Sequence, residues 1–314
     1  MKVLVIGDAI IDEYHHCEPM GKSPKESIIT TRYLHEEAFA GGALAAANHI
    51  AGFCECVHLI TLLGAENSQE KFIQSHLRSN VKAKFFYRED APTPTKRRYI
   101  DPFLAKMFAV YHLNNSDLSP YYESEICNYI DANIQKYDVV LVADFGHGFI
   151  GPQIIELVCN KAPFLAVTAQ TNSANVGFNL ITKYPRADYM CLDSLELRLA
   201  CHDKFGELKA LVPRIGRLLS CNNVAITRGN DGSLTYLSQD GFFEVPALTD
   251  RAVDRLGAGD AYLAITTPCV ARGYPMDMVG FIGNAVGALQ VQIIGNKESV
   301  EPAALFKFIK ALLK

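Results

Sequence analysis

The sequence lacks the features that would direct it to a membrane or to nucleic acid. No apolar run approaches the ~18–20 residues that a helix needs to span a bilayer. The longest basic run is Lys96-Arg97-Arg98 and the formal net charge is −4, so no basic tail or stripe is present. Asp8 and Asp12 interrupt the apolar start of the chain, and no small-residue cleavage site follows. We therefore expect a cytoplasmic protein without a signal peptide, whose main partners are neither membranes nor nucleic acids.

Cysteine pairs at the spacing of a metal site are also missing. Among the nine cysteines, Cys54 and Cys56 form only C-x-C, and no second pair follows at ligand spacing. The odd count in a chain of 314 residues predicts reduced, mostly buried thiols. No Ser/Gly linker, low-complexity tract or internal repeat divides the chain. We therefore expect one domain over residues 1–314.

The chain does carry the composition and the alternation of an α/β protein. It is 49% hydrophobic and 20% charged, which is ordinary for a globular chain. Near-continuous apolar strands that alternate with helices predict a parallel sheet covered on both faces. The predicted strands are residues 2–7, 57–64, 139–143, 164–168, 189–192 and 224–227. The predicted helices are residues 41–53, 153–160, 205–219, 260–272, 276–294 and 302–313.

Two β-prone segments break this rhythm. Residues 26–33 and 83–99 alternate in polarity, and the second segment carries Pro92 and Pro94. We expect them to form a small separate sheet, a lid within approximately residues 13–35 and 83–104. Because small open sheets leave unpaired edges that a second subunit often covers, we also expect a homodimer through this lid.

The strongest chemical signal is the stretch Asp254-Arg255-Leu256-Gly257-Ala258-Gly259-Asp260. Its glycines let the backbone turn sharply and approach a ligand. The turn leads into a helix, so amide N–H groups and the positive helix end point at one spot that can hold a phosphoryl group. Asp260, at the helix start, is placed to take a proton from an attacking hydroxyl. The alternative is an ordinary aspartate N-cap after a glycine turn.

This motif and four others resemble those of the PfkB/ribokinase family of carbohydrate kinases. The others stand in the family's order along nearly the whole chain: Gly7-Asp8-Ala9-Ile10-Ile11-Asp12, Gly41-Gly42-Ala43, Asp193-Ser194-Leu195-Glu196 and Thr227-Arg228-Gly229-Asn230-Asp231-Gly232. The resemblance implies a ribokinase-like three-layer α/β/α sandwich with a mostly parallel central sheet and a small β lid. It also implies ATP-dependent transfer of a phosphoryl group to a sugar hydroxyl.

Within this family, three segments look like the heptose-7-phosphate kinases of lipopolysaccharide-precursor synthesis. They are Gly21-Lys22-Ser23-Pro24, Pro92-Thr93-Pro94-Thr95-Lys96-Arg97-Arg98 and Ala143-Asp144-Phe145-Gly146-His147-Gly148. Lys96 and Arg98 alternate along a strand, so both point to one face, where an arginine can fork onto a phosphate. The alternative is two solvated charges on the lid. No second nucleotide-binding pattern follows Lys314, so we expect the kinase activity without a nucleotidyltransferase.

The resemblance also implies a role for each matching residue. Catalysis falls to Asp260 with Gly257, Ala258 and Gly259, ATP is the phosphoryl donor, and a monovalent-cation requirement stays open. Glu196 should organise Mg²⁺ through water, with assistance from Asp193. The alternative is that Asp193 and Glu196 form a capping box at a helix start. Substrate contacts are expected from Asp8, Asp12, Gly41, Gly42, Asn48, Lys96, Arg98 and Asp144. Nucleotide contacts are expected from Asp193, Thr227, Gly229, Gly232, Arg255 and Asn284.

Two positions depart from the family pattern. Ala45 stands where the family has an asparagine that reads sugar hydroxyls, and Asn48, one helical turn on, is the candidate substitute. Arg255-Leu256 replaces a small, often threonine-containing pair. Loss of an amide from such a site alters specificity more than chemistry. Two alternatives therefore stay open: a nucleoside or small-alcohol kinase of the same fold, and a catalytically silent sugar- or nucleotide-binding regulatory protein.

Overall fold

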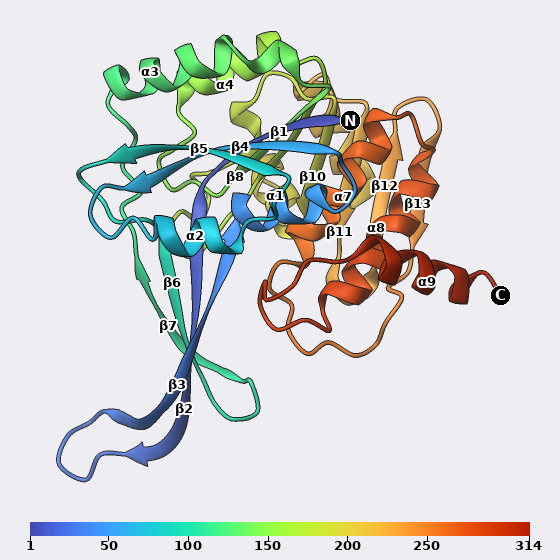
Figure 1. The fold of residues 1–314 in the computed structure, drawn as a ribbon. Coiled ribbons are helices and arrows are strands. Elements are labelled where there is room, and N and C mark those ends of the chain that lie inside the picture. The colour runs from blue at the N-terminus through green and yellow to red at the C-terminus, as the bar shows by residue number, and fades with distance from the viewer.

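The centre of the protein is a nine-stranded sheet in the order β13-β12-β11-β10-β9-β8-β1-β4-β5, seen in a computed structural model that describes residues 1–314 (Figure 1). Neighbouring strands are parallel along the part of this order that runs from β11 through β10, β9, β8, β1 and β4 to β5. Strands β12 and β13 add an antiparallel edge. The strands are β1 (Lys2–Gly7), β4 (Cys56–Gly64), β5 (Val81–Arg88), β8 (Val139–Asp144), β9 (Leu165–Ala169), β10 (Tyr189–Asp193), β11 (Asn223–Thr227), β12 (Ser233–Leu237) and β13 (Gly241–Val245).

Helices cover both faces of this sheet. The helices are α1 (Ala43–Ala51), α2 (Glu70–His76), α3 (Pro120–Asp131), α4 (Pro152–Lys161), α5 (Ser194–Cys201), α6 (Leu208–Leu218), α7 (Ala258–Ala271), α8 (Met276–Gln290) and α9 (Pro302–Leu312). Helices α3 to α6 bury their apolar faces in a core of 35 residues, and α1, α7 and α8 contribute to a second core of 31 residues. Neighbouring residues of a strand point to opposite faces, so Leu4 belongs to the first core and Val5 to the second. The predicted three-layer sandwich is confirmed.

A four-stranded lid, in the order β3-β2-β6-β7, projects from this body (Figure 1). Its strands are β2 (Ala9–Lys22), β3 (Ile29–Gly42), β6 (Thr95–Ile100) and β7 (Lys106–His112). Strand β2 begins two residues after β1 ends, with only Asp8 between them. The lid is therefore a direct extension of β1, an interior strand of the main sheet.

The second predicted lid segment begins too early. Residues 83–88 belong to β5, which pairs in parallel with β4 at the edge of the main sheet. The lid uses β6 and β7 instead, and β7 reaches Lys106–His112, beyond the predicted limit at residue 104. An edge strand and a lid strand both show half-buried alternation, so polarity alone does not separate them. No helix of the chain has the length and apolar character required to cross a membrane.

Candidate active site

The glycine turn faces an open cleft at the start of α7. Gly257 has a φ of +77°, and a Cβ there would lie 2.1 Å from Oδ1 of Asn296, so a side chain would not fit. The first intrahelical bond runs from the Ala261 amide to the Gly257 carbonyl. The amides of Gly259 and Asp260 precede that bond, which leaves them available to an anion.

A cleft of 590 Å³ opens beside this turn and brings together the residues predicted to bind the nucleotide. Five of the six predicted residues line it, together with two residues of the turn. They are Thr227, Gly229, Gly232, Arg255 and Asn284, with Ala258 and Gly259. Asp193 does not line this cleft.

Three of these lining residues shape the cleft walls. The Asn284 side-chain amide donates to the carbonyls of Val245 and Pro246, both at 2.8 Å, so Asn284 holds the loop that follows β13. Gly232 has a φ of +79°, and a Cβ there would lie 2.0 Å from the Val245 carbonyl oxygen. Arg255 donates to Oδ1 of Asn230 at 3.3 Å, which joins two sides of the cleft.

The predicted sugar-binding charges gather at the root of the lid. Asp12 on β2 lies opposite Lys96 on β6 in the strand register. Arg98 donates to Oδ1 of Asp12 at 2.5 Å, and all three side chains are nearly buried. A Cβ on Gly41 would lie 2.1 Å from the other oxygen, Oδ2 of Asp12, so glycine makes room for this carboxylate. Lys96 and Arg98 share one face of the lid, as predicted.

Asp260 belongs to the same group of charges as Asp12 and Lys96. Desolvation and, next, the negative charge of Asp12 raise the pKa of Asp260 to about 7, while Lys96 acts in the opposite direction. Burial lowers the pKa of Lys96 against the opposing effect of Asp12. Its ammonium lies over the rings of Tyr111 and Phe145, at 5.7 and 6.0 Å from their centroids, rather than in an ion pair. The site thus holds a proton acceptor beside an uncommitted cation.

Asp144 and Asp8 support the neighbouring loop and do not face the cleft. Asp144 is fully buried, and its carboxylate accepts from Tyr184 and Lys183, both at 2.6 Å, and from the Gly146 amide at 3.0 Å. Asp8 is 3% exposed and accepts from the Phe145 amide at 2.9 Å. Desolvation, with Asp144 adding to it, raises the pKa of Asp8 to about 6. The oxygens of the Asp144 side chain, for which substrate contacts were predicted, are thus occupied by partners within the protein.

Asn48 does not replace the amide that Ala45 lacks. Its Nδ2 donates to the His76 carbonyl at 2.8 Å, and its Oδ1 accepts from the Arg78 amide at 3.0 Å. Both polar groups of the side chain anchor the end of α2, whereas a substrate contact was predicted for Asn48. Gly42, by contrast, lies at the root of the lid with a φ of +60°, and a Cβ there would approach the Asp8 carbonyl oxygen to 2.6 Å.

Asp193 and Glu196 form the capping box that their spacing allows. The Glu196 amide donates to Asp193 at 2.7 Å, and the Asp193 amide donates back to Glu196 at 2.8 Å. The other Glu196 oxygen accepts from the Thr171 amide at 3.1 Å. Desolvation, and next the charge of Asp193, raise the pKa of Glu196 to about 8, and Asp260 contributes in the same direction. The ionised form of Glu196 is therefore disfavoured here, and a nearby cation would stabilise it.

The turn between β6 and β7 of the lid was not among the residues predicted to form the site. Leu104 and Lys106 line the nucleotide cleft together with residues 247–254. The apolar, β-prone run from Met107 to Tyr111 could have revealed β7. Leu104 and Lys106 lie just beyond the segment that ends at Arg98, and no motif of the resemblance includes them.

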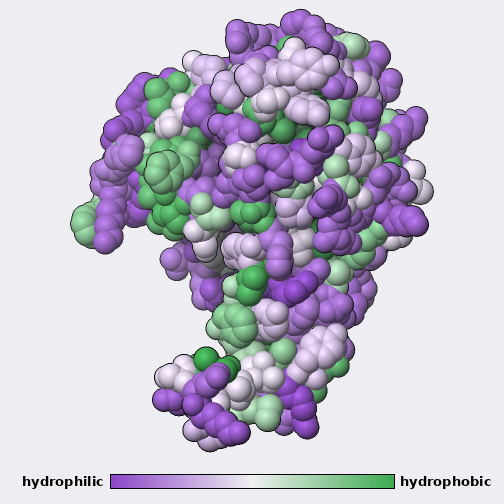
Figure 2. Space-filling view, turned by 90° about the vertical axis from the view of Figure 1, so that its left-hand side faces the viewer, coloured by the Kyte–Doolittle hydropathy of each residue, from purple (hydrophilic) through white to green (hydrophobic).

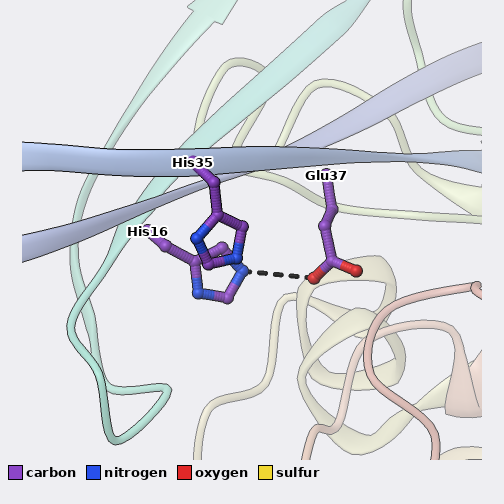
Figure 3. Close-up of side chains that lie close together, drawn as sticks. All are labelled: His16, His35 and Glu37. Carbon is purple, nitrogen blue, oxygen red and sulfur yellow. Dashed lines mark hydrogen bonds and ion pairs between the residues drawn. The ribbon is translucent and has the colours of Figure 1, made fainter.

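One further group of side chains on the lid has the composition of a metal site. His16 and His35 lie opposite each other on β2 and β3, and Glu37 accepts from His16 at 3.2 Å (Figure 3). The two imidazole rings are stacked 4.1 Å apart at an interplanar angle of 12°. Their in-plane lone pairs therefore do not converge on one ion, and Glu37 is already paired with Lys297 at 2.8 Å. The group is better described as a contact between lid and body.

The mostly parallel sheet, the four-stranded lid and the glycine turn with its acid define a ribokinase-like phosphotransferase. The chain belongs to the pfkB family of carbohydrate kinases, which it matches over residues 1–303. It is accordingly an ATP-dependent carbohydrate kinase. The ribokinase of Thermotoga maritima has the same fold, with a TM-score of 0.77 and 16% identity over 98% of this chain and 99% of that one. The phosphofructokinase-2 of Escherichia coli shares it too, with a TM-score of 0.77 and 11% identity over 100% of both chains.

Curated relatives in sequence are longer proteins. The bifunctional protein HldE of Campylobacter jejuni subsp. jejuni serotype O:2 is 25% identical over 299 residues, which are 94% of this chain and 62% of that protein. The bifunctional protein HldE of Trichlorobacter lovleyi is 22% identical over 308 residues, 97% of this chain and 62% of that protein. The chain thus spans about 62% of the length of these relatives.

The reassignment of Asn48 predicts that Asn48→Ala weakens the fold and leaves acceptor binding intact. Two buried hydrogen bonds are lost, so the free energy of unfolding should fall by about 1–3 kcal/mol in chemical denaturation. Asn128→Ala, at an exposed position of α3, is the matched control and should change little. An increased KM for the acceptor at unchanged stability would instead return Asn48 to the substrate site.

Proposed function

We propose that the chain phosphorylates a hydroxyl of a sugar phosphate, with Asp260 as the general base. The observation that carries this proposal is the convergence of Asp12, Lys96 and Asp260 beside the open amides of the glycine turn. The acceptor would lie between the lid and α7, where Oδ2 of Asp12 remains to accept from its hydroxyls. Asp260 would take the proton of the attacking hydroxyl, and the turn amides would hold the transferring phosphoryl group.

The nucleotide would occupy the cleft that Thr227, Gly232 and Asn284 help to line. Mg²⁺ would offset the phosphate charges, and Asp193 and Glu196 would hold it through its hydration shell. A cation at this position would favour the ionised form of Glu196, whose pKa desolvation and the charge of Asp193 raise. Among proteins of similar structure, the Arabidopsis thaliana ribokinase was solved with ribose and ATP. The Escherichia coli phosphofructokinase-2 was solved with potassium, a monovalent cation.

A phosphorylated acceptor is favoured by the uncommitted ammonium of Lys96. Burying a cation without an anionic partner is unfavourable, so Lys96 is expected to meet an anion when the site is filled. The phosphofructokinase-2 of Escherichia coli was solved with fructose-6-phosphate. Similarity to HldE and the segments around Pro92 and Asp144 favour a heptose 7-phosphate-like acceptor in nucleotide-sugar or lipopolysaccharide precursor synthesis.

Asp260→Asn is predicted to lower kcat by about 10²–10⁴-fold, the usual contribution of a general base, and to leave ATP affinity nearly unchanged. Because the pKa of Asp260 is raised to about 7, the free enzyme gains its base as pH rises, so kcat/KM should increase through pH 7. Steady-state kinetics across pH 5.5–8.5 (about three units) and calorimetric titration with ATP measure both effects. Asp277→Asn, an exposed acid in the first turn of α8, is the control. Wild-type turnover by Asp260→Asn would contradict the assignment.

Lys96→Ala is predicted to raise the KM of a phosphorylated acceptor at least about ten-fold and to affect the free sugar much less, since a charge-assisted contact is lost. Arg98→Ala should weaken the use of both the phosphorylated and the free sugar, because Arg98 holds the Asp12 carboxylate.

An ATP-consumption screen over heptose, hexose and pentose phosphates, their free sugars and nucleosides identifies the acceptor. Equal effects of Lys96→Ala on both acceptor forms would favour the nucleoside or small-alcohol alternative. ATP binding without turnover on any acceptor would favour a regulatory protein.

We also propose that the lid forms a homodimer interface. Strands β3 and β7 are its unpaired edges, and apolar side chains lie among polar ones on the projecting lid (Figure 2). Tyr99 stacks on Phe108 at 4.5 Å, while Phe108 is 51% exposed and Tyr33 is 56% exposed. A second lid would cover these rings.

Light scattering at micromolar concentration is predicted to give twice the monomer mass for the wild type. Phe108→Asp should shift the protein to the monomer, because the substitution places a charge in the proposed interface. Phe178→Asp, at a 92% exposed position outside the lid, should leave the mass unchanged. A wild-type monomer would contradict the dimer.

A further inference from the structure

The first acid of the glycine motif, Asp254, joins the lid to the phosphate-binding turn. Its side chain is 6% exposed, and both oxygens are fully used. Oδ1 accepts from the Lys106 ammonium at 2.8 Å and from the Leu256 amide at 3.2 Å. Oδ2 accepts from the Tyr14 hydroxyl at 2.5 Å and from the Gly295 amide at 2.9 Å.

These four donors come from two different parts of the protein. Tyr14 on β2 and Lys106 on β7 belong to the lid, whereas the two amides belong to loops of the body. The bond from Leu256 shapes the backbone directly before Gly257, as an Asx turn does. One carboxylate therefore contacts both the lid and the turn that precedes α7.

Apolar side chains surround this carboxylate and strengthen the junction. A small cluster made by Tyr14, Phe39 and Ile100 of the lid packs against three further residues, Leu104, Leu256 and Ile294. This packing explains Leu256, which departs from the family pattern. Leu256 and Ile294 are the two residues of the body that contact the lid in this cluster. The exclusion of water increases the strength of the polar contacts beside it.

The charge of Asp254 needs a permanent counter-ion. Desolvation raises the pKa of Asp254, but hydrogen bonds from Lys106, Tyr14 and the Gly295 amide outweigh it, so the pKa stays below its ordinary value. The carboxylate is thus ionised, next to a turn that must receive the negative phosphates of ATP. Of the donors, only Lys106 carries a positive charge, and its side chain also lines the nucleotide cleft.

We propose that Asp254 is a positioning residue that couples lid closure to the shape of the phosphate-binding turn, with Lys106 as the built-in cation of that turn. This inference rests on the proposed function, in which residues 257–259 receive the transferring phosphoryl group. An opening lid withdraws Lys106 and Tyr14 and leaves an ionised carboxylate with backbone partners alone. The turn would then lose both its shape and its charge balance, so ATP in the open enzyme would not be hydrolysed without an acceptor.

Hydrogen exchange in the presence of ATP and in the absence of any acceptor tests the coupling directly. Lys106→Met keeps the apolar stem and removes the charge. We expect exchange of the amides in residues 254–260 to accelerate at least about ten-fold, because a local opening becomes easier. Lys106→Arg should preserve wild-type protection. Lys297→Met is the matched control, since it breaks another contact of the lid with the body, the pair with Glu37, without touching Asp254.

Kinetics with the acceptor found in the screen provide a second measurement. We expect Lys106→Met to lower kcat about ten-fold or more with a smaller change in the KM of the acceptor, and Lys106→Arg to restore most of the rate. The double variant Asp254→Asn/Lys106→Met should recover part of the loss, because it no longer leaves an unpaired buried charge. If Asp254 and Lys106 had a purely structural role, the double variant would be less active than both Lys106→Met and Lys106→Arg.

Two results would overturn the proposal. The first is protection of residues 254–260 that is equal in the wild type, Lys106→Met and Lys297→Met. The second is equal acceleration by Lys106→Met and Lys297→Met, which would show that lid opening alone loosens the turn. Neither outcome depends on an acceptor, so failure of the coupling is distinguishable from failure to find a sugar substrate.

Discussion

The desolvation of Asp260 beside the negative charge of Asp12 is the constraint on which the site depends. Desolvation is the larger cause of the raised pKa of Asp260, and the charge of Asp12 acts in the same direction. Lys96 lowers the pKa of Asp260 but forms no direct ion pair with either acid, and Arg98 binds only one oxygen of Asp12. The balance leaves a base that titrates near neutrality, a free acceptor oxygen for a hydroxyl and a cation that lacks its anion. A sugar phosphate would complete all three.

Much of this arrangement could be predicted from the sequence, because it follows from short local patterns. The turn at Gly257 and the helix after it were recognisable from two glycines and an acid, and the alternation of Lys96 and Arg98 gave their shared face. Thr227, Gly232 and Asn284, predicted to share one site, line one cleft, although they come from β11, the turn after it and α8. Each of these motifs carries its own backbone requirement, so its position in the sequence was informative.

The sequence was less informative where a side chain can choose among partners that only the tertiary structure decides. Asn48 stands one helical turn from the expected position, yet the end of α2 uses both of its polar groups. Asp144 lies at the end of a strand, as a ligand-binding acid would. Its carboxylate is instead bound by Lys183 and Tyr184, some forty residues further along the chain. The boundary of the lid was missed for a similar reason, since pairing with β4 rather than composition assigns residues 83–88 to the main sheet.

The continuity of β1 and β2 gives the lid a part in both halves of the chemistry. A single strand carries Asp12 toward the acceptor and, two residues later and therefore on the same face, Tyr14 toward Asp254. Any movement of β2 that displaces one side chain displaces the other, because a strand is stiff over so short a distance. Under the proposed function, the acid that binds the acceptor and the contact that shapes the phosphate-binding turn would consequently arrive together. Lid closure would then gather the charges and order the turn as one event, which is the condition for transferring a phosphoryl group to a sugar rather than to water.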